Sequence, residues 1–166
     1  LGVPAAWIVS FYRFKGRGIL SWLLLLPMAY PAYILAYTYT GVLDFSGPIL
    51  TFLRDAGAPH WLMSPLLNIR SLPGAALMLS LVLYPYVYLL ARAAFMEQSA
   101  NLMEAAYTLG HSRWQVLTGI VIPMARPAIA AGILLAVMET LADFGTVQFF
   151  GVQTFTTGIV LSLIHI

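Results

Sequence analysis

The stretch GAALMLSLVLYPYVYLLA, residues 74–91, decides the fold class of this chain. It holds 18 residues without a charged side chain, and a helix needs about 20 mostly apolar residues to cross the hydrocarbon core of a bilayer. We therefore expect it to be the centre of a membrane span at 73–95. The whole chain fits this interpretation, because 61% of its 166 residues are apolar and 8% are charged, against about 25% charged in an ordinary soluble domain. The fold class predicted is an all-α membrane protein, a polytopic bundle of transmembrane helices.

Three further segments are predicted to lie in the membrane. The run at 19–43 contains no charged residue, and we expect Pro27 and Pro31 to kink it. The run at 127–150 is the last span and the only one with ionisable side chains inside it. Residues 1–12 are apolar but too few to cross, so we expect them to be the end of a truncated span.

The last six residues, LSLIHI at 161–166, match the translation of a transposon-end adapter used in sequencing libraries. We expect them to derive from such an adapter. The membrane domain is accordingly expected to occupy residues 1–160, as part of a larger protein.

The Lys and Arg residues set the expected orientation. Six of the eight lie in or beside the segments 13–18 and 96–123, which the positive-inside rule places in the cytoplasm. The segment 44–72 holds two arginines offset by two aspartates and is expected to be external. A formal net charge of +2 without a basic stripe is too little for a nucleic-acid surface.

The predicted cytoplasmic segment has the pattern of two short capped helices. Asn101 and Glu104 have the spacing of a capping box, and so do Ser112 and Gln115. Between these pairs, Gly110 stands where a helix ends in a left-handed residue. The sequence therefore predicts a helix, a glycine turn and a second helix.

We expect the second helix to end at Pro123. Such a rigid element suits docking in a groove of another protein, and the small Ala105 and Ala106 would allow close approach. The alternative is an amphipathic helix lying on the lipid headgroups. That type carries more basic residues on its polar face, so we favour docking.

This segment reads EAAYTLG at 104–110 and, nine residues later, IVIP at 120–123. It resembles the EAA motif of binding-protein-dependent ABC importer permeases, which is E-A-A, three residues, G, nine residues, I-x-L-P. The one departure is Ile122 in place of leucine. In that family the loop is the coupling helix that fits a cleft on the cytoplasmic ATPase subunit. The resemblance implies this docking role for Glu104, Ala105, Ala106, Gly110, Ile120 and Pro123.

Longer stretches, WLLLLPMAYPAY, RSLPGAALMLSLVLYPYVYLLARAAF and METLADFGTVQFFGVQTFTTGI, look like the ferric-iron class of type I ABC importer permeases. The resemblance implies a multi-pass protein of the bacterial inner membrane. It also implies three protein partners: ABC ATPase subunits that bind ATP and Mg, a periplasmic or extracellular solute-binding protein, and a second permease half. No cofactor is expected in this chain itself. Permeases for thiamine, phosphonates and polyamines are similar in the same loop, so these compounds stay open as alternative substrates.

Two carboxylates lie within the last predicted span. Glu139 and Asp143 are four residues apart and so share one helix face. A carboxylate at that depth costs a few kcal/mol on insertion scales, so it marks a polar cavity, a partner or a transport path. Ferric iron is a hard cation that suits carboxylate oxygen, which makes a translocation contact reasonable. Structural hydrogen bonds to Thr140, Thr146 or tyrosines are the simpler alternative, and no firm metal site is predicted.

The main rival from another class is an intramembrane enzyme. The sequence has neither H-E-x-x-H nor the phosphate-binding pattern G-x-x-x-x-G-K-[S/T]. A rhomboid-like serine enzyme would need a histidine to partner a serine within the membrane. The histidines of this chain are His60 in the external segment, His111 in the cytoplasmic one and His165 in the suspected adapter tail. We therefore expect that this chain is not an enzyme and that a separate subunit hydrolyses ATP. A channel or a lipid-facing scaffold remains possible on composition alone.

Overall fold

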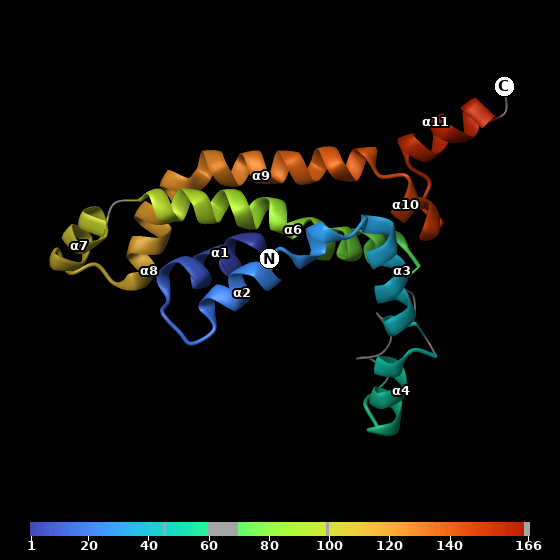
Figure 1. Ribbon diagram of the computed structural model, residues 1–166, viewed down its shortest axis with the longest axis horizontal. Coiled ribbons are helices and arrows are strands. Elements are labelled where there is room, and N and C mark those ends of the chain that lie inside the picture. Colours follow the sequence, from blue (N-terminus) through green and yellow to red (C-terminus); the bar gives the residue numbers. More distant parts are fainter. Residues whose placement is uncertain (45, 60–69, 99, 165–166) are drawn as a thin grey trace. The chain divides into compact units, whose positions relative to one another are not determined.

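A computed structural model describes residues 1–44, 46–59, 70–98 and 100–164 (Figure 1). None of these residues lies in a strand, so the predicted all-α class is confirmed. The elements in chain order are α1 (Gly2–Phe11), α2 (Arg17–Leu23), a 3₁₀-helix (Leu26–Ala29), α3 (Ala32–Leu43), α4 (Pro48–Asp55), α6 (Leu72–Glu97), α7 (Ala100–Thr108), α8 (Arg113–Val116), a π-helix (Leu117–Val121), α9 (Ile122–Ala142), α10 (Gly145–Phe149) and α11 (Phe155–Ile164).

The chain divides into two compact units. The first contains Leu1–Leu26 and Leu83–Met138, and the second contains Pro27–Val82 and Glu139–Ile166. Charge is divided unevenly between them. The first unit holds six of the eight Lys and Arg residues, and the second holds four of the six acidic residues.

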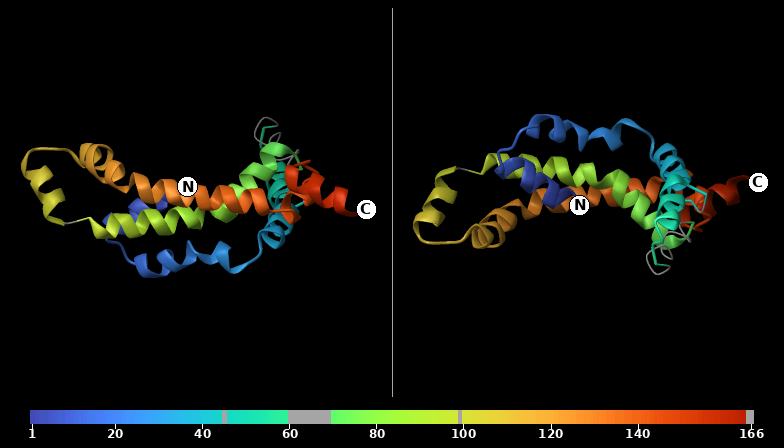
Figure 2. Two further views of the ribbon diagram at one scale, coloured as in Figure 1. Left: turned by 90° about the horizontal axis from the view of Figure 1, so that it is seen from above. Right: turned by 90° about the horizontal axis from the view of Figure 1, so that it is seen from below.

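Two helices in the described part of the chain are long and apolar enough to cross a membrane. One is α6, with 26 residues, and the other is the continuous helix Arg113–Ala142, with 30 residues, which joins α8, the π-helix and α9. Within the first unit, α6 and α9 lie side by side in all views (Figures 1 and 2). Large apolar side chains on the outer face of α9 are exposed, among them Leu134 (63%) and Met138 (65%), as expected of a surface that faces lipid.

The run at 19–43 is not one continuous helix, so the structure has a break where we expected a kink. It contains most of α2, the 3₁₀-helix and α3, and the breaks fall around two prolines. Pro27 lies in the 3₁₀-helix, and Pro31 has φ −57° and ψ 139° immediately before α3. Each proline removes a backbone donor and disfavours helical geometry in the residue before it. Two prolines four residues apart therefore interrupt the helix rather than bend it.

The second helix of the 96–123 segment does not end at Pro123 but continues through it to Ala142. The π-helix immediately before Pro123 accounts for this. A π turn widens the backbone, which relieves the clash that a proline ring makes with the carbonyl four residues earlier in a regular helix. The predicted start of the last span at 127 thus falls inside α9 and not at a helix end.

The core of the first unit forms where α1 and α9 pack on α6. A Cβ atom added at Gly2 would lie 2.8 Å from the Tyr84 carbonyl oxygen of α6. On α9, a Cβ atom added at Gly132 would lie 2.8 Å from Val87 Cα. The absence of a side chain at Gly2 and at Gly132 thus allows α1 and α9 to approach α6 closely. The buried residues are Ala6, Val9, Tyr88, Ala91, Phe95, Ala106, Val116, Leu117, Val121 and Ala125.

The second unit has a smaller core, built from Ala36, Ala75, Met78 and Phe150. The rings of Tyr37 and Phe149 pack edge to face with centroids 5.8 Å apart. The last helix, α11, continues to Ile164 and so includes four residues of the suspected adapter tail. Residues 165–166 lie outside the described residues.

Candidate docking loop and intramembrane carboxylates

The glycine turn between α7 and α8 is the best-defined feature of the predicted docking loop. Gly110 has φ 83°, in the left-handed region that favours glycine. The Gly110 amide donates to the Tyr107 carbonyl at 3.0 Å, and the His111 amide donates to the Ala106 carbonyl at 3.1 Å. These two bonds form the Schellman motif that terminates a helix, and they confirm the helix, glycine turn and helix predicted from the sequence.

A capping box begins α8 as predicted. The Gln115 amide donates to Ser112 Oγ at 3.3 Å, and the Ser112 amide donates to Gln115 Oε1 at 2.7 Å. The corresponding prediction for α7 is wrong in its position. That helix begins at Ala100, so Asn101 lies inside the first turn, where a helical backbone rules out the N-cap role.

Removal of the capping box at the start of α8 gives a measurable prediction. Replacing Ser112 with alanine removes the acceptor of the Gln115 backbone amide, and we expect the protein to lose about 1 kcal/mol of stability. Thr118→Ala is the matched control on the same helical segment. Thr118 Oγ1 only donates back to the Trp114 carbonyl at 2.9 Å, a bond that adds little to a helix. Thermal unfolding of the purified protein would compare the two, and equal losses would contradict the capping role.

The motif residues divide into an exposed set and a packed set. Glu104, Ala105 and Gly110 are exposed. Ala106 is 4% exposed and belongs to the core of the first unit, so its small side chain allows close packing within this chain. Ile120 of the π-helix and Pro123 of α9 are half-buried.

The turn is flanked by two large apolar side chains. The sequence analysis did not assign either of them to docking. Leu109 is 79% exposed and Trp114 is 67% exposed. The periodicity of α7 predicts Leu109 on the same face as Ala106. The turn at Gly110 starts immediately after Leu109, so the helical periodicity no longer determines where that side chain lies. We name Glu104, Ala105, Leu109, Gly110 and Trp114 the docking surface.

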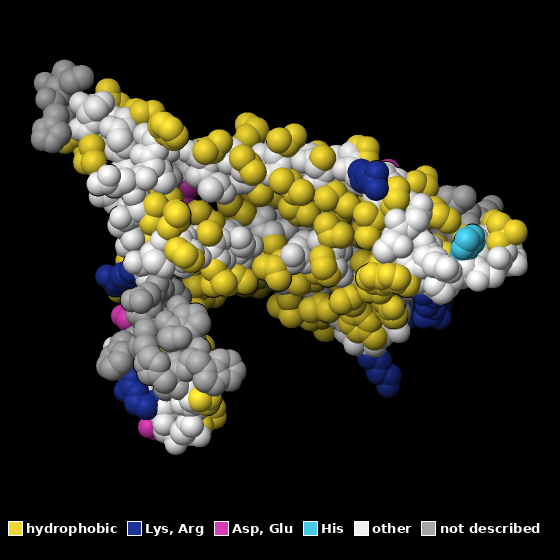
Figure 3. Space-filling model, turned by 180° about the vertical axis from the view of Figure 1, so that it is seen from behind, with side chains coloured by type: hydrophobic (Ala, Val, Ile, Leu, Met, Phe, Trp, Pro, Cys, Tyr) yellow, Lys and Arg dark blue, Asp and Glu magenta, His cyan; other side chains and the backbone are white. Residues whose placement is uncertain are grey.

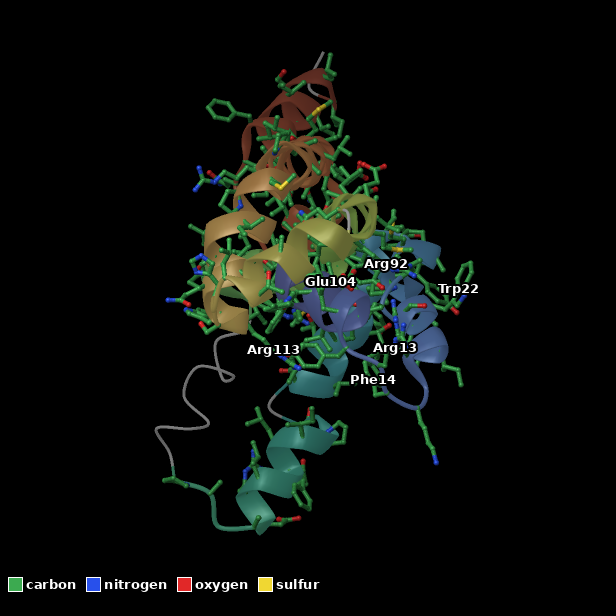
Figure 4. All side chains as sticks on the ribbon, turned by 90° about the vertical axis from the view of Figure 1, so that its left-hand side faces the viewer. Arg13, Phe14, Trp22, Arg92, Glu104 and Arg113 are labelled. Carbon is green, nitrogen blue, oxygen red and sulfur yellow. The ribbon has the colours of Figure 1, made fainter. Side chains whose placement is uncertain are left out.

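A pocket of about 340 Å³ lies between α1 and the loop. Glu104 and Arg113 both line it, and Figure 4 labels them at this end of the first unit. The remaining lining residues are Trp7, Phe11, Tyr12, Tyr107, Val116, Leu117 and Val121. Glu104 is thus an exposed residue that lines a pocket of aromatic and aliphatic side chains, to which Arg113 adds a guanidinium group.

The loop is also tied to the membrane helices. The Gln98 side-chain amide, just after α6, donates to the Val121 carbonyl of the π-helix at 3.0 Å. Because α8 continues through the π-helix into α9, the docking surface has a continuous helical connection to one spanning helix and a hydrogen bond to the end of the other. A displacement of the loop would therefore act on both.

The two carboxylates of the last predicted span differ in environment. Glu139 is exposed in the last turn of α9, whereas Asp143 is half-buried just after that helix ends. Asp143 Oδ1 accepts the Thr146 amide at 3.1 Å, while Asp143 Oδ2 and Thr146 Oγ1 are buried without a hydrogen-bond partner among the described residues. Asp143 thus makes one of the structural contacts considered from the sequence, and it lies at a helix end rather than midway along a span. Among the residues that the structure describes, no group of three or more His, Cys, Asp or Glu side chains is placed to hold a metal ion.

Long apolar helices and an outward-facing apolar surface are the features of a helical membrane protein. Comparison with known families is consistent with that class. The sequence profile of the binding-protein-dependent transport system inner membrane component matches residues 1–164. The chain belongs to this family, which comprises the type I ABC importer permeases.

The names of individual relatives specify different transported substrates. The sulfate transport system permease protein CysT of Escherichia coli is 31% identical over 151 residues, covering 89% of this chain and 50% of the relative. The molybdenum transport system permease protein ModB of Haemophilus influenzae is 28% identical over 145 residues, covering 87% and 60%. The Fe(3+)-transport system permease protein FbpB 2 of H. influenzae is 28% identical over 159 residues, covering 96% and 27%. The chain spans about half the length of the sulfate permeases that it matches.

Proposed function

We propose that this chain is part of the permease subunit of an ATP-driven importer whose cargo is ferric iron. The observation that carries the importer function is the docking surface on the turn between α7 and α8. It combines the EAA pattern with a left-handed Gly110 and two exposed apolar side chains. A surface of this kind fits a groove in a partner protein, which we take to be a cytoplasmic ATPase subunit that binds ATP and Mg.

Transport is coupled to ATP hydrolysis through movement of the docking loop and not through chemistry on this chain. When the partner binds nucleotide, its groove displaces the loop, and the continuous helix through α8 and α9 carries that displacement into the membrane. The Gln98 bond to Val121 transmits it to α6. Nucleotide shifts the balance between inward-open and outward-open states only by its different affinity for the two.

The proposal includes an orientation. Segments 13–18 and 96–123 face the cytoplasm, because six of the eight basic residues lie in or beside them. The segment 44–72 is then external, where a solute-binding protein would deliver the cargo. A second permease half completes the transport path.

Ferric iron as cargo is supported by the carboxylates near the end of α9. Glu139 is exposed, and Asp143 Oδ2 accepts no hydrogen bond from the described residues. Hard cations prefer such oxygen ligands. A pair of carboxylates without a third ligand nearby in the described chain suits transient contact, because a site in a transport path must also release its ion. The match to FbpB 2 over 96% of this chain points the same way.

A second candidate cargo is a tetrahedral oxyanion, which the names of CysT and ModB favour. Thr146 Oγ1, buried without a hydrogen-bond partner in the described residues, could donate to such an anion. Two carboxylates on the same path would repel a dianion, which is why we rank the cation first.

Uptake assays distinguish the two cargoes. Cells that make the complete transporter should take up radiolabelled ferric iron, and Glu139→Gln and Asp143→Asn should each lower the rate about tenfold if one ligand contact is worth about 1.4 kcal/mol. The asparagine side chain in the second variant would keep an acceptor for the Thr146 amide, so that change removes charge while preserving the structural bond. Glu97→Gln, at the exposed end of α6, is the control and should leave uptake unchanged.

Three results would contradict the ferric assignment. They are saturable sulfate or molybdate uptake without iron uptake, unchanged iron uptake in both carboxylate variants, and an equal loss in the Glu97 control. Membrane levels of each variant, measured by immunoblot, separate a transport defect from failure to assemble.

A further inference from the structure

A second cluster of charge lies on the first unit, away from the docking surface. Arg17 begins α2, and its guanidinium donates to the Ser10 carbonyl at 3.4 Å. Arg92 lies near the end of α6, and its side chain interacts with the Tyr88 side chain one turn earlier. Arg17 also acts electrostatically on the Tyr88 hydroxyl, which itself donates to the Ser21 carbonyl at 3.3 Å. The Tyr88–Ser21 bond joins α6 to α2, and Arg17 lies one turn before Ser21 while Arg92 lies one turn after Tyr88, so the two arginines flank the same contact between helices.

Part of the hydrogen-bonding capacity of this cluster is unused. Arg92 Nε and Ser10 Oγ are both buried without a hydrogen-bond partner in the described part of the chain. A guanidinium has five N–H donors in a fixed planar arrangement, and a buried donor without an acceptor is costly. These two atoms are themselves out of reach of an outside ligand, but Arg92 as a whole is only half-buried, so the other N–H groups of its guanidinium are the donors that a further oxygen ligand would meet.

The described helices around the cluster supply no carboxylate that neutralises it. Residues 1–43 contain no Asp or Glu, and the two acidic residues of the first unit are Glu97 and Glu104. Glu97 lies five residues beyond Arg92 and so projects from another face of α6. Both glutamate side chains are exposed. An oxygen ligand for the cluster is thus expected from an anion outside the chain.

The surface of α2 beside the cluster is strongly apolar. Ile19 is 70% exposed, Trp22 is 76% exposed and Leu23 is 53% exposed. Figure 4 labels Arg92 and Trp22 on the same side of the view, and Figure 3 shows hydrophobic side chains over the helices of the first unit. Tryptophan is typical of the membrane interface. A cationic centre beside an exposed apolar helix matches a ligand with a charged head and an apolar tail.

We propose that Arg17 and Arg92 bind the phosphate of an anionic phospholipid of the cytoplasmic leaflet, with its acyl chains along Ile19, Trp22 and Leu23. Guanidinium groups bind phosphate oxygens in a bidentate manner, and basic pockets between helices on the cytoplasmic side hold lipid headgroups. The site is independent of the cargo and of the ATPase partner. A free phosphate ion shares the headgroup chemistry, so the test must separate the two sources.

The test uses the full permease chain, purified in a neutral detergent and titrated with phosphatidylglycerol or phosphatidylcholine while native mass spectrometry counts bound lipid. We expect phosphatidylglycerol to bind and phosphatidylcholine to bind at least tenfold more weakly. Each of Arg17→Gln and Arg92→Gln should weaken phosphatidylglycerol binding about fivefold, as expected for one basic residue at an anionic surface. Arg92→Lys should restore part of the loss.

Arg126→Gln is the matched control, since Arg126 is exposed on α9 of the same unit and its loss changes the net charge equally. It should leave binding unchanged. Equal binding of the two lipids, or an equal loss in the Arg126 variant, would overturn the proposal. Displacement of phosphatidylglycerol by millimolar inorganic phosphate would assign the site to a soluble anion and also overturn it. If Arg92→Gln fails to fold, Arg17→Gln and Arg92→Lys supply the same comparison.

Discussion

A permease carrying Gly110→Glu is expected to purify without the ATPase subunit that we propose as its partner, whereas the unchanged permease is expected to retain that subunit. Gly110 has φ 83°, and a side chain in the left-handed region costs about 1–2 kcal/mol. The substitution therefore strains the turn that sets α8 relative to α7. It also adds a negative charge and a long side chain at the centre of the docking surface, where close approach to the partner is required.

The control must strain a glycine turn equally without touching the docking surface. Gly57 meets this condition, because it has φ 70° and a Cβ atom added there would meet no described atom within 4 Å, and it lies in the predicted external segment. Gly57→Glu should retain the ATPase subunit. The measurement is the ratio of ATPase subunit to permease after affinity purification. Equal ratios for the two variants would show that the turn is not the docking site.

The parts of the site that sequence could predict are those set by local chemistry. Gly110 ends a helix in a left-handed conformation because only glycine adopts it freely. The capping box of Ser112 and Gln115 depends on two residues three apart. Both are properties of a few neighbouring residues, so their spacing is sufficient to predict them.

The parts that sequence missed depend on packing or on a choice between two local structures. Ala106 has the small side chain of a docking residue, but α7 turns it into the core of the first unit. Pro123 has the composition of a helix end, but the π-helix before it lets the helix continue. At Pro27 and Pro31 the outcome is the opposite, and the helix breaks. Pro85 and Pro127 also lie inside continuous helices, so the presence of a proline alone does not predict whether a helix breaks.

Substitution of Gly132 is expected to have the largest effect on folding. Its missing side chain is what allows α9 to approach α6, because a Cβ atom there would lie 2.8 Å from Val87 Cα and 3.2 Å from the Tyr86 carbonyl oxygen. Both are backbone atoms of α6, so no change of rotamer relieves the overlap. Gly132→Leu should lower the free energy of unfolding by about 3 kcal/mol, and Gly132→Ala by less.

Gly41 provides the matched control for this series. It also lies inside a helix, but a Cβ atom there would meet no atom of the described residues within 4 Å. Gly41→Ala should therefore stabilise the protein by about 0.5–1 kcal/mol, since alanine restricts the unfolded chain more than glycine. The midpoint of unfolding in a denaturing detergent would give both values. Opposite signs for the two alanine variants would trace the effect at Gly132 to contact between α9 and α6 rather than to helix propensity, and equal signs would contradict that packing.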